Sequence, residues 1–178
     1  MYEDCIGAKP LSVILSAVTG LGKGSLYGAF GDKHALYLRV FDGYCADIAA
    51  ALDRSLDGPD AGAFARLCQH VRAVAQNTAS DTERRGCFLA NGTAELAGRD
   101  SDVADISLRT FDILLELIAT DLRGAQRCGD IDPAADADEL ANVVLAVLRG
   151  IEALGKAGRS RESLGAIAES AIAMLPKG

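Results

Sequence analysis

Apolar residues recur at steps of three and four along almost the whole chain, which is the spacing of one face of an α-helix. In the stretch 33–52 these positions are Leu36, Val40, Phe41, Tyr44, Ile48 and Leu52. No run of alternating or β-branched residues bounded by turns indicates a strand. The pattern therefore predicts an all-α fold.

Breaks in this periodicity divide the chain into further helices. Loops are expected at 56–62 and 84–86, with helices from 64 to 74 and from 87 to 97 on either side of the second break. A long helix is predicted at 102–127, with Gly129 just after its end. Asp136 and Glu139 have the spacing of a capping box, and a last helix follows at 164–175.

Composition narrows the class of protein. Hydrophobic residues make up 49% of the 178 residues, and no apolar run has the length of a membrane span. Acidic residues stand where a signal peptide would be positive, so we expect a cytoplasmic protein. The five cysteines include no C-x-x-C pair and only two histidines accompany them, so we expect neither a metal site nor a cofactor. The net charge of −7 arises entirely after residue 44, which suggests an N-terminal part with a different role.

The stretch GLGKGSLYGAF (20–30) is the most informative motif. A phosphate-binding P-loop would need glycine at Ala17 and serine or threonine at Gly24, after a strand that the pattern does not contain. A helix-turn-helix explains the stretch better, because Gly20 suits the tight turn between two helices. Lys23, Ser25 and Tyr27 would then face outward at the start of the second helix, where backbone N–H groups attract phosphate.

The longer segment GLGKGSLYGAFGDKHALYLRVFDGY (20–44) resembles the DNA-binding signature of TetR-family transcriptional regulators. The agreement covers the glycine turn, K-G-x-L-Y-x-x-F, and the K-x-x-L that opens the next helix. The segment RRGCFLANGTAEL (84–96) is similar to the R-G-C-x-x-x-N segment of one branch of that family. The resemblance implies a ligand-responsive regulator that dimerises through its last two helices.

Carried over position by position, the resemblance implies DNA contacts at Lys23, Gly24, Ser25, Tyr27 and Lys33. Gly28 and Ala29 stand where many members carry larger side chains. The first helix of the family domain is expected to be absent, because a Gly-Tyr-Glu-like corner falls at Tyr2 and Glu3. We predict a helix-turn-helix domain over 1–45 and a ligand-binding and dimerisation domain over 46–178.

A ligand cavity is predicted among the central helices, and we expect its ligand to be largely apolar. Asn91 either caps a backbone group or orients the ligand. Cys87 follows two arginines and starts a helix, which favours a thiolate, so it is either the most reactive of the five thiols or a small buried side chain. The candidate lining residues are Phe64, Cys68, Cys87, Phe88, Asn91, Phe111 and Leu115.

The dimer is predicted to form through 136–175, because the run 143–148 is apolar throughout and the last helix carries small residues. The chain offers no Ser/His/Asp set or metal cluster, so we do not expect an enzyme. We predict a ligand-responsive transcriptional regulator, of the repressor type, that binds double-stranded operator DNA as a homodimer and is released by a small molecule. The alternatives are an electrophile- or redox-sensing regulator acting through Cys87, and a dimeric binding protein without DNA binding.

Overall fold

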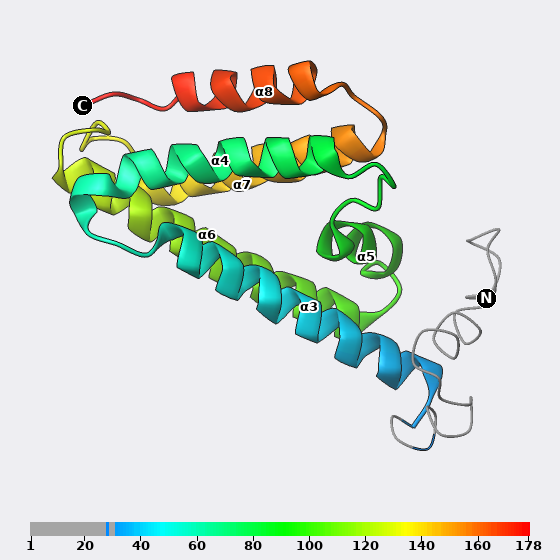
Figure 1. The fold of residues 1–178 in the computed structure, drawn as a ribbon. Coiled ribbons are helices and arrows are strands. Elements are labelled where there is room, and N and C mark those ends of the chain that lie inside the picture. The colour runs from blue at the N-terminus through cyan, green and yellow to red at the C-terminus, as the bar shows by residue number, and fades with distance from the viewer. Residues whose placement is uncertain (1–27, 29–30) are drawn as a thin grey trace. The chain divides into compact units, whose positions relative to one another are not determined.

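The structure, a computed structural model, describes residue 28 and residues 31–178, and within this part it confirms the all-α prediction (Figure 1). A short 3-10 turn, η1, precedes the second of the described helices. The elements in chain order are α3 (Lys33–Leu56), η1 (Asp60–Gly62), α4 (Ala63–Ser80), α5 (Phe88–Leu96), α6 (Ser101–Arg127), α7 (Ala137–Lys156) and α8 (Arg161–Ala173).

The chain divides into two compact units, residues 1–40 and residues 41–178. The division falls inside α3, because this helix is continuous from Lys33 to Leu56. The domain boundary expected after residue 45 lies on the same helix. One helix therefore belongs to both units.

The larger unit is built around α4, which packs against α6, α7 and α8. Figure 1 shows α8 lying along α4, with α7 behind them and α6 running beneath. The helices pack because each carries an apolar stripe that the next one covers. The largest fully buried side chains of this core are Phe41, Leu67, Leu89, Leu114, Ile118, Leu122, Ile131, Leu148, Ile151 and Leu164.

Local sequence signals set several helix ends. Asp100 caps α6 by accepting from Val103 N, and Ser160 caps α8 by accepting from Ser163 N, both at 3.2 Å. Asp136 caps α7 by accepting from the backbone N–H groups of residues 138 and 139. After α6, Gly129 has a φ of +80°, the left-handed conformation expected of a glycine that follows a helix.

The part of α3 inside the larger unit runs beside α6. Asp42 pairs with Arg109 at 2.8 Å, and Phe41, fully buried, meets the ring of Phe88 edge-on at 5.4 Å. Because the ion pair is exposed, its contribution to stability is small. The contact between the buried Phe41 ring and the half-buried Phe88 ring holds this part of α3 in place.

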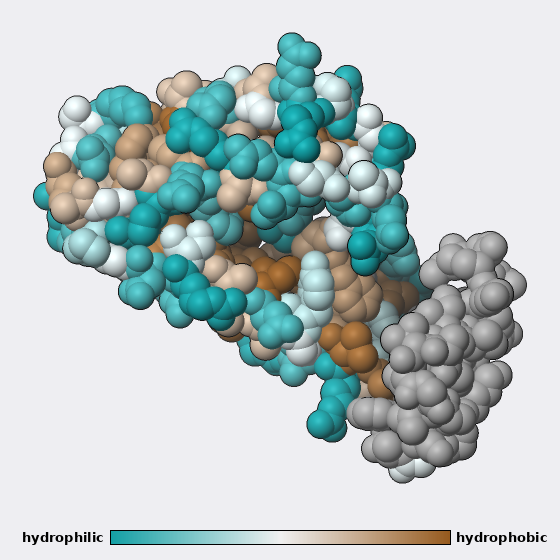
Figure 2. Space-filling view, viewed as in Figure 1, coloured by the Kyte–Doolittle hydropathy of each residue, from teal (hydrophilic) through white to brown (hydrophobic). Residues whose placement is uncertain are grey.

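The visible surface carries polar side chains over much of its area, and hydrophobic ones line a hollow between α3 and α4 (Figure 2). None of the helices in the described part combines the length and the apolar character that crossing a membrane requires.

Leu122 and Leu108 provide a matched test of this core on one helix. Leu122 has no exposed surface, whereas Leu108 is 61% exposed. Leu122→Ala should lower the free energy of unfolding by about 2–5 kcal/mol, because it removes buried methyl groups and leaves a cavity. Leu108→Ala should change it by less than about 0.5 kcal/mol. Urea denaturation measures both, and equal effects would contradict the packing described here.

A candidate ligand pocket around Cys87

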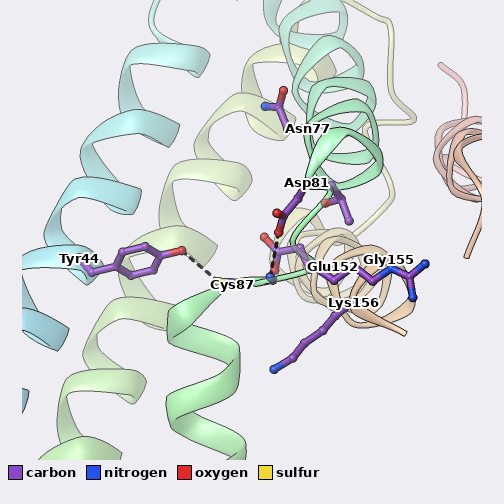
Figure 3. A pocket seen from close by; sticks show the side chains of 10 residues that line it. Tyr44, Asn77, Asp81, Cys87, Glu152, Gly155 and Lys156 are labelled. Atoms are coloured by element: carbon purple, nitrogen blue, oxygen red, sulfur yellow. Dashed lines mark hydrogen bonds between the residues drawn. The ribbon is translucent and has the colours of Figure 1, made fainter. Parts of the chain in front are cut away.

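A pocket of about 170 Å³ lies where α3, α4 and α7 meet the connection between α4 and α5 (Figure 3). This space equals about five or six water molecules, and it is close to an engineered cavity of about 150 Å³ that holds benzene. Its lining residues are Tyr44, Asn77, Thr78, Asp81, Arg84, Gly86, Cys87, Glu152, Gly155 and Lys156.

The connection between α4 and α5 folds around Asp81. The Asp81 carboxylate accepts from Gly86 N at 3.2 Å, and its carbonyl accepts from Arg84 N at 3.1 Å. Arg84 and Gly86 both have positive φ, at 52° and 68°, which lets the chain reverse within a few residues. This turn is the break predicted at 84–86, and it delivers Cys87 to the pocket as the N-cap residue of α5.

Two helices approach closely at the opposite wall. A β-carbon at Gly155 on α7 would collide with the methyl group of Thr78 on α4. Glycine at this position therefore allows the helices to pack at this separation. This wall of the pocket therefore consists of the backbone at Gly155 and the small hydroxyl side chain of Thr78.

The Cys87 thiol is 5% exposed and has two polar neighbours. Arg149 Nη1 donates to Sγ at 3.1 Å, and the Tyr44 hydroxyl donates to it from 3.9 Å. The cation at the thiol is therefore Arg149 on α7. Of the two arginines that precede Cys87 in the sequence, Arg84 also lines the pocket, whereas Arg85 pairs with Glu83 at 3.0 Å and is 77% exposed.

Glu152 completes this polar cluster. It pairs with Arg149 at 3.0 Å, and both side chains are largely buried. Burial raises the pKa of Glu152 above its usual range, and the nearby guanidinium of Arg149 opposes that rise. Burial likewise raises the pKa of Tyr44, whose hydroxyl accepts from Phe88 N at 3.2 Å. The pocket lining thus includes a hydroxyl, a thiol and the carboxylate that pairs with Arg149.

Asn91 makes hydrogen bonds to a backbone group and to a side chain. Its Nδ2 donates to the carbonyl of Arg85 at 3.0 Å, and its Oδ1 accepts from Lys156 Nζ at 2.7 Å. Of the two roles considered from the sequence, the structure shows the bond to a backbone group.

The other predicted lining residues are spread through the larger unit. Phe64 on α4 lies under Lys177 Nζ, at 3.9 Å from its ring centroid, and Cys68 is buried in the core. Phe88 packs edge-on against Tyr44 at 5.4 Å. Phe111 and Leu115 are half-buried on α6. Among the seven predicted residues, Cys87 is the one that lines this pocket.

The pocket is more polar than the expected cavity. Tyr44, Arg149, Glu152 and Lys156 were not singled out from the sequence as site residues. One signal was present: Arg149 and Glu152 are opposite charges at i and i+3, directly after the apolar run 143–148. Opposite charges at this spacing can pair on one face of a helix, and charges that packing buries need such partners.

The predicted DNA contacts lie almost entirely outside the described residues. Lys23, Gly24, Ser25 and Tyr27 belong to the part that the structure does not describe, and Lys33 is the first residue of α3. These assignments stay predictions.

Comparison with known proteins finds a family model and several relatives that match this chain. A family model described as "Tetracyclin repressor-like, C-terminal domain" matches residues 63–171. The HTH-type transcriptional repressor ComR of Escherichia coli (strain K12) is 25% identical over 163 residues, which cover 92% of this chain and 78% of ComR.

Two solved structures resemble the chain over most of its length. One is a cysteine mutant of the TetR family transcriptional regulator CifR complexed with 26-bp double-strand operator DNA. It has a TM-score of 0.76 and 25% identity, and the match covers 92% of this chain and 85% of CifR. The other is the regulatory protein TetR from Rhodobacter sphaeroides, with a TM-score of 0.81, 24% identity, and coverage of 92% and 86%.

The thiols allow a direct test of the pocket. Burial raises the pKa of Cys45 and of Cys68, and neither lines the pocket. Cys87 should therefore react with N-ethylmaleimide several-fold faster than Cys45 and Cys68, because the pocket admits the reagent to it. Mass spectrometry of the peptides over time measures the three rates. Labelling of Cys45 or Cys68 before Cys87 would show that the pocket is closed to small molecules.

Proposed function

Since this chain belongs to the tetracycline-repressor-like family, the TetR family of transcriptional regulators, we propose that it is a ligand-responsive repressor that binds operator DNA as a homodimer. The observation that carries the proposal is the likeness, over 92% of the chain, to a regulator bound to operator DNA. The relatives ComR and DhaR are likewise transcriptional repressors. We infer that its role is regulatory and not catalytic, and that it acts in the cytoplasm.

The DNA-reading part is the N-terminal segment. The signature over 20–44 supports this assignment, and so does the lack of net charge in residues 1–44 of an otherwise acidic chain. We propose Lys23, Gly24, Ser25 and Tyr27 as contacts of the second helix of the helix-turn-helix. Lys33, at the start of α3, is proposed as a phosphate contact.

The effector is proposed to enter the pocket beside Cys87. Its volume of about 170 Å³ and its lining of hydroxyl, amide and charged groups favour a small polar molecule. A small polar ligand differs from the sequence-based prediction, which was a largely apolar ligand among Phe64, Phe88 and Phe111. Sensing by covalent reaction at Cys87 is the alternative, and Arg149 beside the sulfur is compatible with it. The comparisons do not favour this alternative over reversible binding.

The homodimer is proposed to form through α7 and α8, whose outer faces carry exposed apolar side chains. Val143 on α7 is 57% exposed, and Met174 directly after α8 is 82% exposed. Not every residue of the apolar run 143–148 can contact a partner subunit, however, because Val144 is 6% exposed and belongs to the core. A test of the dimer must therefore change Val143, since a charge at Val144 would damage the fold itself.

Salt dependence tests the DNA contact proposed for Lys33. Operator fragments are first selected from random duplex DNA with the full-length protein. Lys33→Ala should then reduce the slope of log affinity against log salt concentration by about 1, because one phosphate is no longer neutralised. Arg159→Ala, which removes an equal charge between α7 and α8, is the matched control and should leave the slope unchanged. An unchanged slope for Lys33→Ala would remove Lys33 from the interface.

Sedimentation velocity tests the dimer. Val143→Glu should raise the dissociation constant on the order of 100-fold or more, because an unpaired carboxylate in an apolar interface costs about 3 kcal/mol or more. Leu108→Glu is the control, since Leu108 is an exposed leucine on α6. A monomeric unmodified protein at micromolar concentration, or equal effects of the two variants, would refute an interface on this face.

A further inference from the structure

The buried ion pair between Arg149 and Glu152 is incompletely hydrogen-bonded. In the part of the chain that the structure describes, the buried side-chain atoms without a hydrogen-bond partner are Arg149 Nε, Glu152 Oε2 and Asp121 Oδ2. Two of these atoms belong to this one pair, although Arg149 Nη1 lies 3.0 Å from Glu152 Oε2. A buried polar atom without a partner is costly, so it marks a place where a further donor or acceptor would stabilise the protein.

Glu152 differs from Asp121 in what surrounds it. Asp121 accepts from Arg66 at 2.7 Å and does not line the pocket beside Cys87. Glu152 does line that pocket, and its partner Arg149 also donates to Cys87 Sγ at 3.1 Å. A molecule in the pocket can therefore contact Glu152. Its donor groups would complete the hydrogen bonding of a carboxylate that Arg149 leaves incomplete.

Asp81 places a second carboxylate in the same pocket. Its Oδ2 accepts from Gly86 N at 3.2 Å, and its Oδ1 lies 4.0 Å from Nε of Arg85, which is 77% exposed. An exposed ion pair at this distance is weak. Asn77 and Tyr44 add an amide and a hydroxyl to the lining, and Figure 3 shows Tyr44 reaching toward this region from α3. The pocket is therefore rich in acceptor oxygens.

The two cationic side chains of the lining have their charged ends elsewhere. Lys156 Nζ donates to Asn91 Oδ1 at 2.7 Å, and Figure 3 shows this ammonium pointing away from the two carboxylates. A β-carbon at Gly158, in the connection after α7, would come within 2.7 Å of Arg84 Nη1. Neither Asn91 nor Gly158 lines the pocket. Both cations thus contribute mainly their stems to the lining, and the carboxylates determine its charge.

We propose that the effector of this pocket is a small organic ammonium ion whose N–H groups donate to Glu152 and Asp81. The proposal rests on the ligand-responsive function proposed above, and it names the chemical class of the ligand. The guanidinium of Arg149 balances one of the two carboxylates, so a single positive charge on the ligand would balance the other. Hydrogen bonds from an ammonium to a carboxylate are charge-assisted, which offsets the loss of water around both groups.

The size of the pocket restricts this class further. Its volume is about 170 Å³. An engineered cavity of about 150 Å³ holds benzene, so the ligand has on the order of six non-hydrogen atoms. Short alkylammonium ions meet this limit, whereas long polyamines do not.

Three probes of similar size separate the effect of charge from that of shape: n-butylammonium, 1-butanol and butyrate. Each is titrated into the ¹⁵N-labelled full chain, and the amide signals of Gly86 and Gly155, which line the pocket, report binding in NMR spectra. n-Butylammonium should bind about 10-fold more tightly than 1-butanol, because its hydrogen bonds are charge-assisted. Butyrate should bind more weakly than either. If 1-butanol or butyrate binds as tightly as n-butylammonium, or if n-butylammonium shifts neither signal, the proposal is overturned.

Substitutions in the same titration identify the two carboxylates. Glu152→Gln and Asp81→Asn nearly preserve the size of each side chain and remove its charge. Each should weaken the binding of n-butylammonium about 10-fold and change that of 1-butanol less than about 3-fold. Glu139→Gln is the matched control, because Glu139 is an exposed glutamate about 20 Å from Glu152 along α7. This control should change neither affinity.

Glu152→Gln leaves Arg149 without its anion, so the second substitution keeps the test independent of folding. The amide oxygen of Asp81→Asn can still accept from Gly86 N, which preserves the turn. Unchanged affinity for n-butylammonium in Asp81→Asn, or in folded Glu152→Gln, would overturn the assignment. No titration here uses DNA. Failure to prefer n-butylammonium would leave the proposed repressor function standing, and failure to bind operator would leave the ligand class standing.

Discussion

Continuity of α3 is the constraint on which the account depends. The helix runs without a break from Lys33 to Leu56, while the compact units divide at residues 40 and 41. Hydrogen bonds between successive turns make a helix stiff along its axis. Tyr44 lines the pocket and Phe41 packs on Phe88, so the part of the helix that belongs to the larger unit contacts the pocket and the start of α5 directly.

The polar side chains of Arg149, Glu152 and Cys87 restrict which ligands can bind beside α3. Arg149 donates to the Cys87 thiol and forms an ion pair with Glu152, and both charged side chains are largely buried. A ligand that enters must replace some of these interactions with equivalents, because an unpaired buried charge is costly. This requirement and the size of the pocket together support the small polar molecule proposed above as the ligand.

The helices were predictable from sequence because their signals are local. The 3.6-residue periodicity, the cap at Asp136 and the glycine after α6 all involve residues within a few positions of one another. Contacts across the fold were not predictable in this way. Arg66 and Asp121 are 55 positions apart, and Cys87 and Arg149 are 62 apart. The same limit applies to the run 143–148, since only packing decides that Val144 faces the core and Val143 does not.

The central claim is that the pocket and operator DNA act on the same helix, and the alkylation rate of Cys87 tests it most directly. Linkage requires that if pocket occupancy changes DNA affinity, bound DNA must change what the pocket accepts. The rate with N-ethylmaleimide is measured with and without saturating operator, using exposed Cys128 as the internal control. We predict that operator changes the Cys87 rate several-fold and leaves the Cys128 rate unchanged. An unchanged Cys87 rate on operator-bound protein would contradict the coupling.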